Sequence, residues 1–182
     1  NAKSLDPYKL LVSNIGKLPE ARKKIDSEDV DFKTTFFQTY RNGLSTPTLD
    51  KILTLKKYAL DTDISGLIDI LTQIYTATEY SGLERGFIAY YMAKKSSLTF
   101  EEIALWDEFK TKAHVFDMKQ VNNSVLRAQL EKVLYNDHAK EVMNNLALTS
   151  SAIQTDIDNG DYAEEVLDWF TLQTQKIALL SK

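Results

Sequence analysis

The feature that most constrains the fold is one uninterrupted helical pattern, which runs from about Asp63 to Lys95. Its apolar residues recur at mixed three- and four-residue intervals, as on one face of an amphipathic helix. They are Leu67, Ile70, Leu71, Ile74, Ala77, Leu83, Phe87, Ile88 and Tyr91. Because each residue adds about 1.5 Å, this helix spans roughly 50 Å. A helix of that length needs partners of similar length, so the sequence predicts an all-α fold, an elongated antiparallel helical bundle.

The rest of the chain contains little that would interrupt helices. Its 182 residues include only 6 Gly and 3 Pro, and β-branched residues do not alternate with polar ones. Strands and tight turns therefore have weak support. We predict a single helical domain over residues 1–182. Its further helices are expected at about 7–15, 19–26, 31–42, 46–55, 100–116, 122–148 and 162–180.

Several local patterns predict where these helices begin and end. Thr99-Phe100-Glu101-Glu102 fits the capping box, in which the first and fourth side chains each accept a backbone N–H of the other. Gly43 indicates a break, and Thr46-Pro47 is typical of an N-cap followed by a first-turn proline. The pieces on either side of Gly43 form either two helices or one kinked helix. The segment 158–160 predicts a turn, after which Asp161 is expected to cap the last helix.

Composition excludes several classes of function. The net charge is -4 and the pI near 5.3, without a clustered basic surface, so no nucleic-acid partner is expected. The absence of cysteine removes disulfides, thiolate metal sites and thiol catalysis. No apolar run approaches the ~20 residues that cross a bilayer, so a membrane anchor would lie outside this chain. The start at Asn1-Ala2 leads us to expect an excised fragment of a longer receptor.

Catalysis has no support in the sequence. His114 and His138 lie on different predicted helices, without carboxylates at the spacing of metal ligands. The acidic pairs 101–102 and 164–165 are explained by the positive ends of helix dipoles. There is no glycine-rich phosphate loop. We therefore predict no enzyme, no catalytic residue, no metal site and no cofactor.

The best candidate for a ligand site is the segment around Arg85. Gly82 and Gly86 lie inside the long helix, where each costs about 1 kcal/mol relative to alanine. Small residues on one stripe allow a neighbouring helix or a ligand to approach the backbone. Arginine suits a planar oxyanion because its fork donates two parallel hydrogen bonds. The alternative is that Glu84 or Glu79 pairs with Arg85 or with a neighbouring residue, and that the glycines serve packing alone.

Arginine is scarce here, with four among 22 basic residues. Arg127 has Glu131 four residues later, which indicates a surface salt bridge. Arg41 ends a predicted helix, where a cation favours the terminal carbonyl groups. Arg22 either bridges to Asp26 or contributes to the ligand site.

Three segments, in order, resemble the nitrate- and nitrite-sensing domain family. The segment 82–86, Gly-Leu-Glu-Arg-Gly, is similar to part of its second half. The segment 18–26 is similar to its Leu-Pro-x-x-Arg-x-x-Val-Asp pattern, and 168–177 to its closing Trp-x-x-x-x-Thr-x-Lys-Ile pattern. An earlier Glu-Arg-Gly helix, common in the family, has no counterpart here, so the N-terminal family helix is expected to be missing.

The resemblance implies an all-helical, non-enzymatic input domain of chemoreceptors (methyl-accepting chemotaxis proteins), histidine kinases or antitermination regulators. Some members bind nitrate or nitrite through arginines between helices. Carried over by motif, Arg85 is the leading ligand residue and Arg22 the second, with Glu84, Gly82 and Gly86 beside them. The sequence thus favours a sensor of a small anion such as nitrate or nitrite, in a periplasmic domain or, alternatively, a cytoplasmic one. The competing hypothesis is a structural or protein-interaction bundle, in which the glycines serve a homodimer contact without a small ligand.

Overall fold

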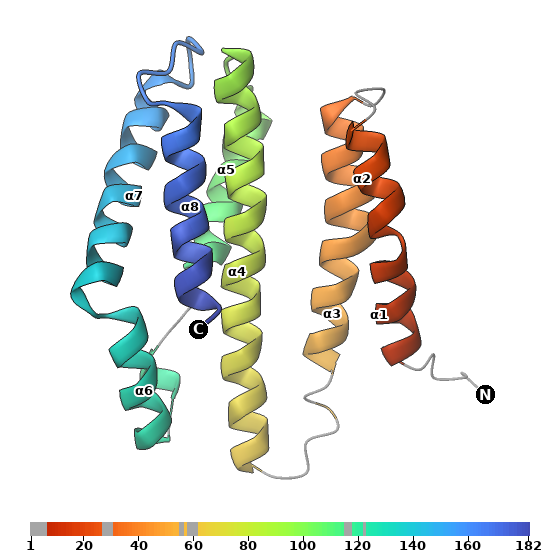
Figure 1. Cartoon of the computed structure of the whole chain (residues 1–182), viewed down its shortest axis with the longest axis vertical. Helices are drawn as coiled ribbons and strands as arrows, with labels where there is room; N and C mark the ends of the chain where they lie inside the picture. Colours follow the sequence, from red (N-terminus) through yellow and green to blue (C-terminus); the bar gives the residue numbers. More distant parts are fainter. Residues whose placement is uncertain (1–6, 27–30, 55–56, 58–61, 115–117, 122) are drawn as a thin grey trace. The chain divides into compact units, whose positions relative to one another are not determined.

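The computed structural model describes residues 7–26, 31–54, 57, 62–114, 118–121 and 123–182. These residues form helices and turns, with no strand among them, which confirms the predicted all-α fold. The α-helices are α1 (Pro7–Gly16), α2 (Leu18–Asp26), α3 (Thr46–Thr54), α4 (Thr62–Lys94), α5 (Phe100–Ala113), α6 (Ser124–Leu134), α7 (Asp137–Asp156) and α8 (Val166–Leu180) (Figure 1). A π-helical segment, Thr34–Ser45, precedes α3, and a short 3-10 turn, Met118–Gln120, precedes α6.

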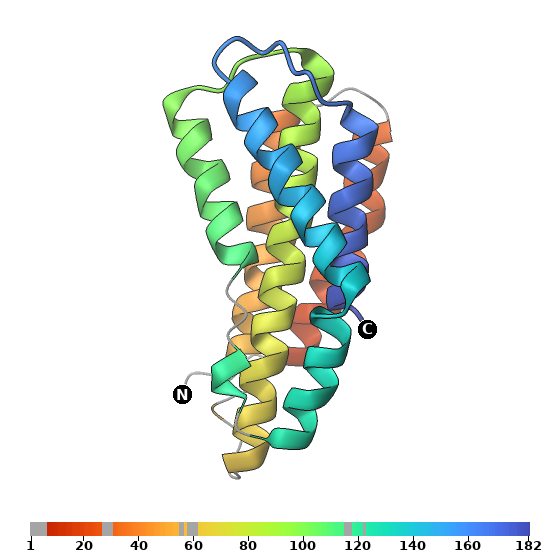
Figure 2. The same ribbon diagram turned by 90° about the vertical axis from the view of Figure 1, so that its left-hand side faces the viewer.

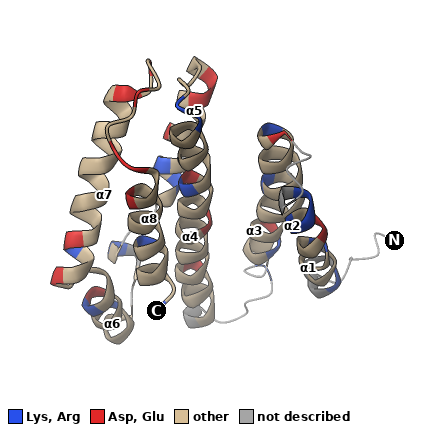
Figure 3. Cartoon of the chain, turned by 45° about the horizontal axis from the view of Figure 1, so that its top comes forward, with Lys and Arg blue, Asp and Glu red and all other residues tan. Residues whose placement is uncertain are grey.

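The chain divides into two compact units, Asn1–Thr72 and Gln73–Lys182. In the first unit, α1 packs on α2, on α3 and on the π-helical segment. In the second, α4 and α7 run in one direction while α5 and α8 run in the other (Figures 1 and 2). This antiparallel order agrees with the predicted bundle. Figure 3 shows basic and acidic residues side by side on these helices.

Aromatic side chains fill the core of the second unit. The Phe87 and Phe109 rings meet edge to face, with centroids 5.7 Å apart. Trp106 of α5 and Trp169 of α8 are fully buried, and their indole N–H groups donate to the Glu84 carboxylate and the Arg85 carbonyl of α4. Contacts of this kind add to the hydrophobic stabilisation that burial of the rings supplies. The core therefore joins α4, α5 and α8.

The long helix α4 confirms the predicted one almost residue for residue. It ends in a Schellman motif, in which Lys95 has a positive φ of 48° and the Ser96 N–H donates to the Tyr91 carbonyl. Its second half buries the predicted apolar positions. Leu67 and Leu71, which were also predicted to be buried, are instead 46% and 50% exposed.

The segments on either side of Gly43 form one helical run rather than two separate helices. The chain stays helical from Thr34 into α3, and the backbone N–H of Thr46 donates to the Arg41 carbonyl within this run. A Cβ at Gly43 would lie 3.0 Å from the Gln38 carbonyl oxygen. In a π-helix each backbone N–H donates to the carbonyl five residues earlier instead of four. The Gln38 carbonyl therefore lies close to Gly43, which favours a residue without a Cβ.

The predicted helix over 122–148 is two helices. Asn136 caps α7 by accepting the backbone N–H of Ala139, and its amide donates to the Lys132 and Val133 carbonyls at the end of α6. Asparagine prefers this position because its side chain competes with the helical backbone for hydrogen bonds. The capped helix α7 then continues to Asp156.

The connections around α5 and α8 agree with the predictions in part. The capping box of Thr99 and Glu102 is present. Residues 158–160 form the predicted turn, where Gly160 has φ +72° and a Cβ there would lie 2.7 Å from the Ser96 carbonyl carbon. Asp161 does not cap α8, because that helix begins only at Val166, after Glu165.

No described helix combines the length and the apolar character that a bilayer crossing requires.

Candidate ligand-binding sites

Arg85 lies half-buried in α4, where its guanidinium faces α8. Nη1 donates to the Thr174 hydroxyl at 2.8 Å, and Cζ lies 4.4 Å from the centre of the Phe170 ring. The buried Nε has no hydrogen-bond partner. A stacked, singly bonded guanidinium with a spare N–H keeps capacity for an anion.

The adjacent backbone also ties α4 to α8. The Trp169 indole N–H donates to the Arg85 carbonyl at 3.1 Å, and the Thr174 hydroxyl donates to the Phe170 carbonyl. The second of these bonds fixes the orientation of the Thr174 hydroxyl, which accepts the hydrogen bond from Arg85. The guanidinium is held between two helices by a hydroxyl and an aromatic face.

Glu84 points into the core rather than toward Arg85. Its carboxylate is 3% exposed and accepts the indole N–H of Trp106 at 3.1 Å. Burial raises the pKa of this carboxyl group, while Lys176, Gln173 and the Trp106 hydrogen bond oppose the rise. Among the described residues no ion pair joins Glu84 to Arg85, so the alternative in which Glu84 neutralises Arg85 is wrong.

The two glycines of the segment are half-buried. A Cβ at Gly82 would meet no atom within 4 Å, so tight packing within this chain does not explain that glycine. Arg22 is exposed on α2, in the first unit, and its part in a ligand site stays a prediction. The structure thus places Gly82, Glu84 and Arg85 on one helix, and the Arg85 guanidinium contacts Thr174 and Phe170 of α8.

A buried polar stripe on α8 was missed by the sequence analysis. Trp169, Gln173, Lys176 and Leu180 follow one another at helical spacing, and all four are buried. Gln173 is 0% exposed and Lys176 1% exposed. Phe170 lies outside this buried stripe: it is 42% exposed and stacks on Arg85. The spacing of Trp169, Gln173 and Lys176 in the sequence places them on one face of a helix. It did not predict their burial, because glutamine and lysine side chains are rarely fully buried.

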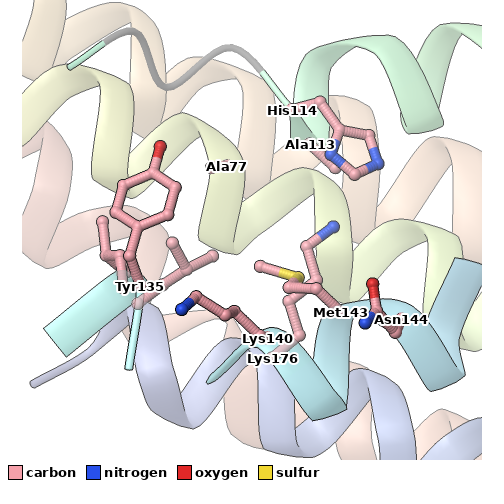
Figure 4. Close-up of a pocket in the computed structure, with 10 residues that line it drawn as sticks. Ala77, Ala113, His114, Tyr135, Lys140, Met143, Asn144 and Lys176 are labelled. Carbon is pink, nitrogen blue, oxygen red and sulfur yellow. The ribbon is translucent and has the colours of Figure 1, made fainter. Parts of the chain in front are cut away.

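His114 and Met143 each line two hollows in the second unit. One, of about 470 Å³, has Lys176 and His114 among its lining residues, and the other, of about 450 Å³, has Glu84 and His114. In Figure 4 the Lys176 side chain extends toward His114. Partial burial, followed by the charge of Lys176, lowers the pKa of His114. Burial lowers the pKa of Lys176, and Glu84 opposes this shift.

The remaining arginine predictions differ in outcome. Arg127 donates twice to the backbone carbonyl of Val121 rather than forming a described ion pair with Glu131. Arg41 lies inside the continuous helical run, so it does not end a helix. Within the described residues no group of three or more His, Cys, Asp or Glu side chains is placed to hold a metal ion.

The described part of the chain is an all-helical module in which one cationic side chain, Arg85, is held between two helices. A family model described as nitrate and nitrite sensing matches residues 2–182, and the chain therefore belongs to this family. Membership makes it a non-catalytic sensing module of signalling proteins. No curated protein and no solved structure matches the chain.

Proposed function

We propose that this domain binds nitrate or nitrite between α4 and α8, with Arg85 as the principal contact, and passes the binding event to an output domain. The observation that carries the proposal is the partly unsatisfied guanidinium in a chain of this family. An anion that reaches Nε would complete its hydrogen bonding. A buried donor without a partner is destabilising by about 1–3 kcal/mol, so the ligand would relieve an existing deficit.

The same contacts supply a route for the signal. Arg85 bonds Thr174 on α8, so an anion that competes with this bond changes how α8 sits on α4. A ligand shifts such an equilibrium only by its difference in affinity for the two packings. Helix α8 ends at Leu180, and we propose that it carries the shift onward to a following helix.

The proposal is tested by the melting temperature of the purified chain in nitrate and in nitrite. Saturation at about 100 times Kd adds about 2.7 kcal/mol, which raises the Tm of a chain of this size by about 5–10 °C. Arg85→Ala should remove this rise. Arg127→Ala removes the same charge in the same unit and should keep it. A wild-type melting curve unmoved by millimolar nitrate and nitrite would refute the proposal.

The partners and location follow from the same proposal. We assign the domain to a bacterial receptor, a chemoreceptor of the methyl-accepting type being the favoured case, with the domain in the periplasm. An anchor in such a receptor would lie in segments other than these helices. A reporter fusion of the full receptor, scored for nitrate-dependent output, tests this assignment.

One observation favours the second candidate, a homodimer contact without a ligand. Because a Cβ at Gly82 meets no atom within 4 Å, open space lies beside this position of α4. A second copy of the chain could occupy that space. This candidate predicts self-association and no response to nitrate.

A further inference from the structure

The hollow beside Lys176 lies apart from the Arg85 contact and has its own chemistry. Its lining comes from the five helices α4 to α8 and from the residues that end α5 and α6. The lining residues are Ala77, Ala113, His114, Leu134, Tyr135, Lys140, Met143, Asn144, Lys176 and Leu180 (Figure 4). Arg85 is not among them. All belong to the second unit.

The charge of this lining suits an anion. Lys176 is 1% exposed, and its Nζ has no hydrogen-bond partner. Asn144 adds an amide, and the lining contains no aspartate or glutamate. Lys140, a second cation of the lining, pairs with Asp137 at 3.6 Å, so Lys176 is the cation left for a ligand. A buried ammonium group without a partner is costly, and an anion bonded to it would offset that cost.

Glu84 does not already fill this role. The charge of Glu84 opposes the lowering of the Lys176 pKa, but among the described residues no ion pair within 4 Å joins the two side chains. The Glu84 carboxylate instead accepts the Trp106 indole N–H. It also lines the other hollow rather than this one. All three N–H donors of the Lys176 ammonium group therefore remain available to a ligand.

The apolar part of the lining points to an organic ligand rather than a bare inorganic ion. The side chains of Met143, Leu134 and Leu180 and the two alanines form much of the wall. The volume of about 470 Å³ is in the range of small-molecule pockets, which pair apolar walls with a few polar groups. Nitrate would leave these walls uncovered. Methionine adapts readily to ligands of different shape.

We propose that this cavity binds a small organic monocarboxylate, with its carboxylate on Lys176 and its hydrocarbon part against Met143 and the two leucines. Asn144 and His114 flank the carboxylate. The site is separate from the nitrate contact at Arg85. The domain would thereby respond to a second class of anion.

The test is a series of titrations of the 182-residue chain with acetate, butyrate, hexanoate and nitrate, followed by ¹H–¹⁵N NMR. Each buried methylene should tighten binding about fourfold, so butyrate should bind about fifteen times more tightly than acetate. The shifted amides should include those of Ala113, Asn144 and Lys176. Equal affinity along the series, or shifts confined to other residues, would overturn the proposal.

Two variants separate the buried cation from general attraction to positive charge. Lys176→Met keeps an apolar stem and should weaken hexanoate binding at least tenfold. Lys132→Met removes an exposed lysine of α6 that lies outside the lining and should weaken it by less than threefold. Equal losses in the two variants would contradict a carboxylate bound at Lys176.

Arg85→Ala completes the design, because it should abolish the nitrate response and leave hexanoate binding within twofold of wild type. Loss of both responses would overturn the assignment of a separate site. The chain-length series uses the wild-type protein, so it decides the matter even if a variant does not fold.

Discussion

Glu84 and Lys176 are ionisable side chains in the interior of the second unit, and burial opposes the charge of each. Burial raises the pKa of Glu84 and lowers that of Lys176. The folded chain therefore holds a proton on Glu84 more strongly than the unfolded chain does. This contribution to stability is complete below the ordinary pKa of 4.5 and is lost as the pH rises through the folded-state pKa.

The first prediction concerns Glu84→Gln, which keeps an acceptor for Trp106 and removes the titration. As the pH rises above 4.5, wild type should lose free energy of unfolding relative to the variant, by at most about 1.4 kcal/mol per pH unit. Urea denaturation between about pH 5 and pH 8 measures the difference. Both proteins retain Lys176, but the variant removes the charge that opposes the lowered pKa of Lys176, so the comparison reports the titration of Glu84 together with Lys176.

Glu101→Gln is the matched control, because Glu101 is exposed in the first turn of the same α5 helix that carries Trp106. It should follow the wild-type pH dependence. A Glu84→Gln curve parallel to that of wild type would show that the buried carboxyl does not titrate differently in the folded chain.

Sequence alone predicted which arginine lies at a helix seam, but not the polar residues of the core. Arg85 was identified because arginine is scarce and two glycines flank it. Gln173 and Lys176 were not identified, because burial of a polar side chain depends on which residues surround it in the folded chain. His114 was set aside on sequence spacing, yet α7 and α8 bring Met143 and Lys176 to it across the fold.

At the scale of elements, helix ends with a local chemical cause were predicted best. The capping box at Thr99 depends on four consecutive residues, and it is present as predicted. The π-helical run through Gly43 could not be read from local rules, since these assign a break to glycine. Asn136 was overlooked because the apolar spacing continues past it.

The second prediction is that Thr99→Ala lowers the free energy of unfolding by about 1 kcal/mol, because the Glu102 N–H loses its acceptor. Thr111→Ala, at an exposed position late in α5, should change it by less than half as much. Chemical denaturation of both variants gives the values. Equal effects would mean that the cap contributes nothing beyond helix propensity.

The third prediction compares two glycines. Gly160→Ala should destabilise the fold by at least about 1–2 kcal/mol, because φ is positive there and the added Cβ meets the Ser96 backbone. Gly82→Ala should stabilise it by about 0.5–1 kcal/mol, since the helix gains propensity and the Cβ meets nothing. Thermal and urea unfolding provide the comparison. A destabilised Gly82→Ala variant would contradict the open space at that position.

At the scale of the whole molecule, a long periodic helix and few glycines and prolines sufficed to predict an all-α antiparallel fold. The division into two compact units was not predicted, because α4 carries one continuous pattern through both. The family was predicted from three motifs in order, and the match over residues 2–182 confirms it.

The fourth prediction concerns self-association, which separates the two candidate functions. If Gly82 serves a dimer contact, sedimentation velocity of wild type will depend on concentration, and Gly82→Leu will weaken that dependence. If the space serves a ligand, both proteins will sediment as the same species, and only Gly82→Leu will have lost its nitrate response. We expect the second result.

The most direct test of the central claim is a crystal structure of the chain grown in saturating nitrate. Our account predicts a planar anion between α4 and α8, within hydrogen-bonding distance of the Arg85 Nε that has no partner now. A nitrate-saturated structure in which Arg85 still contacts only Thr174 and Phe170 would contradict it.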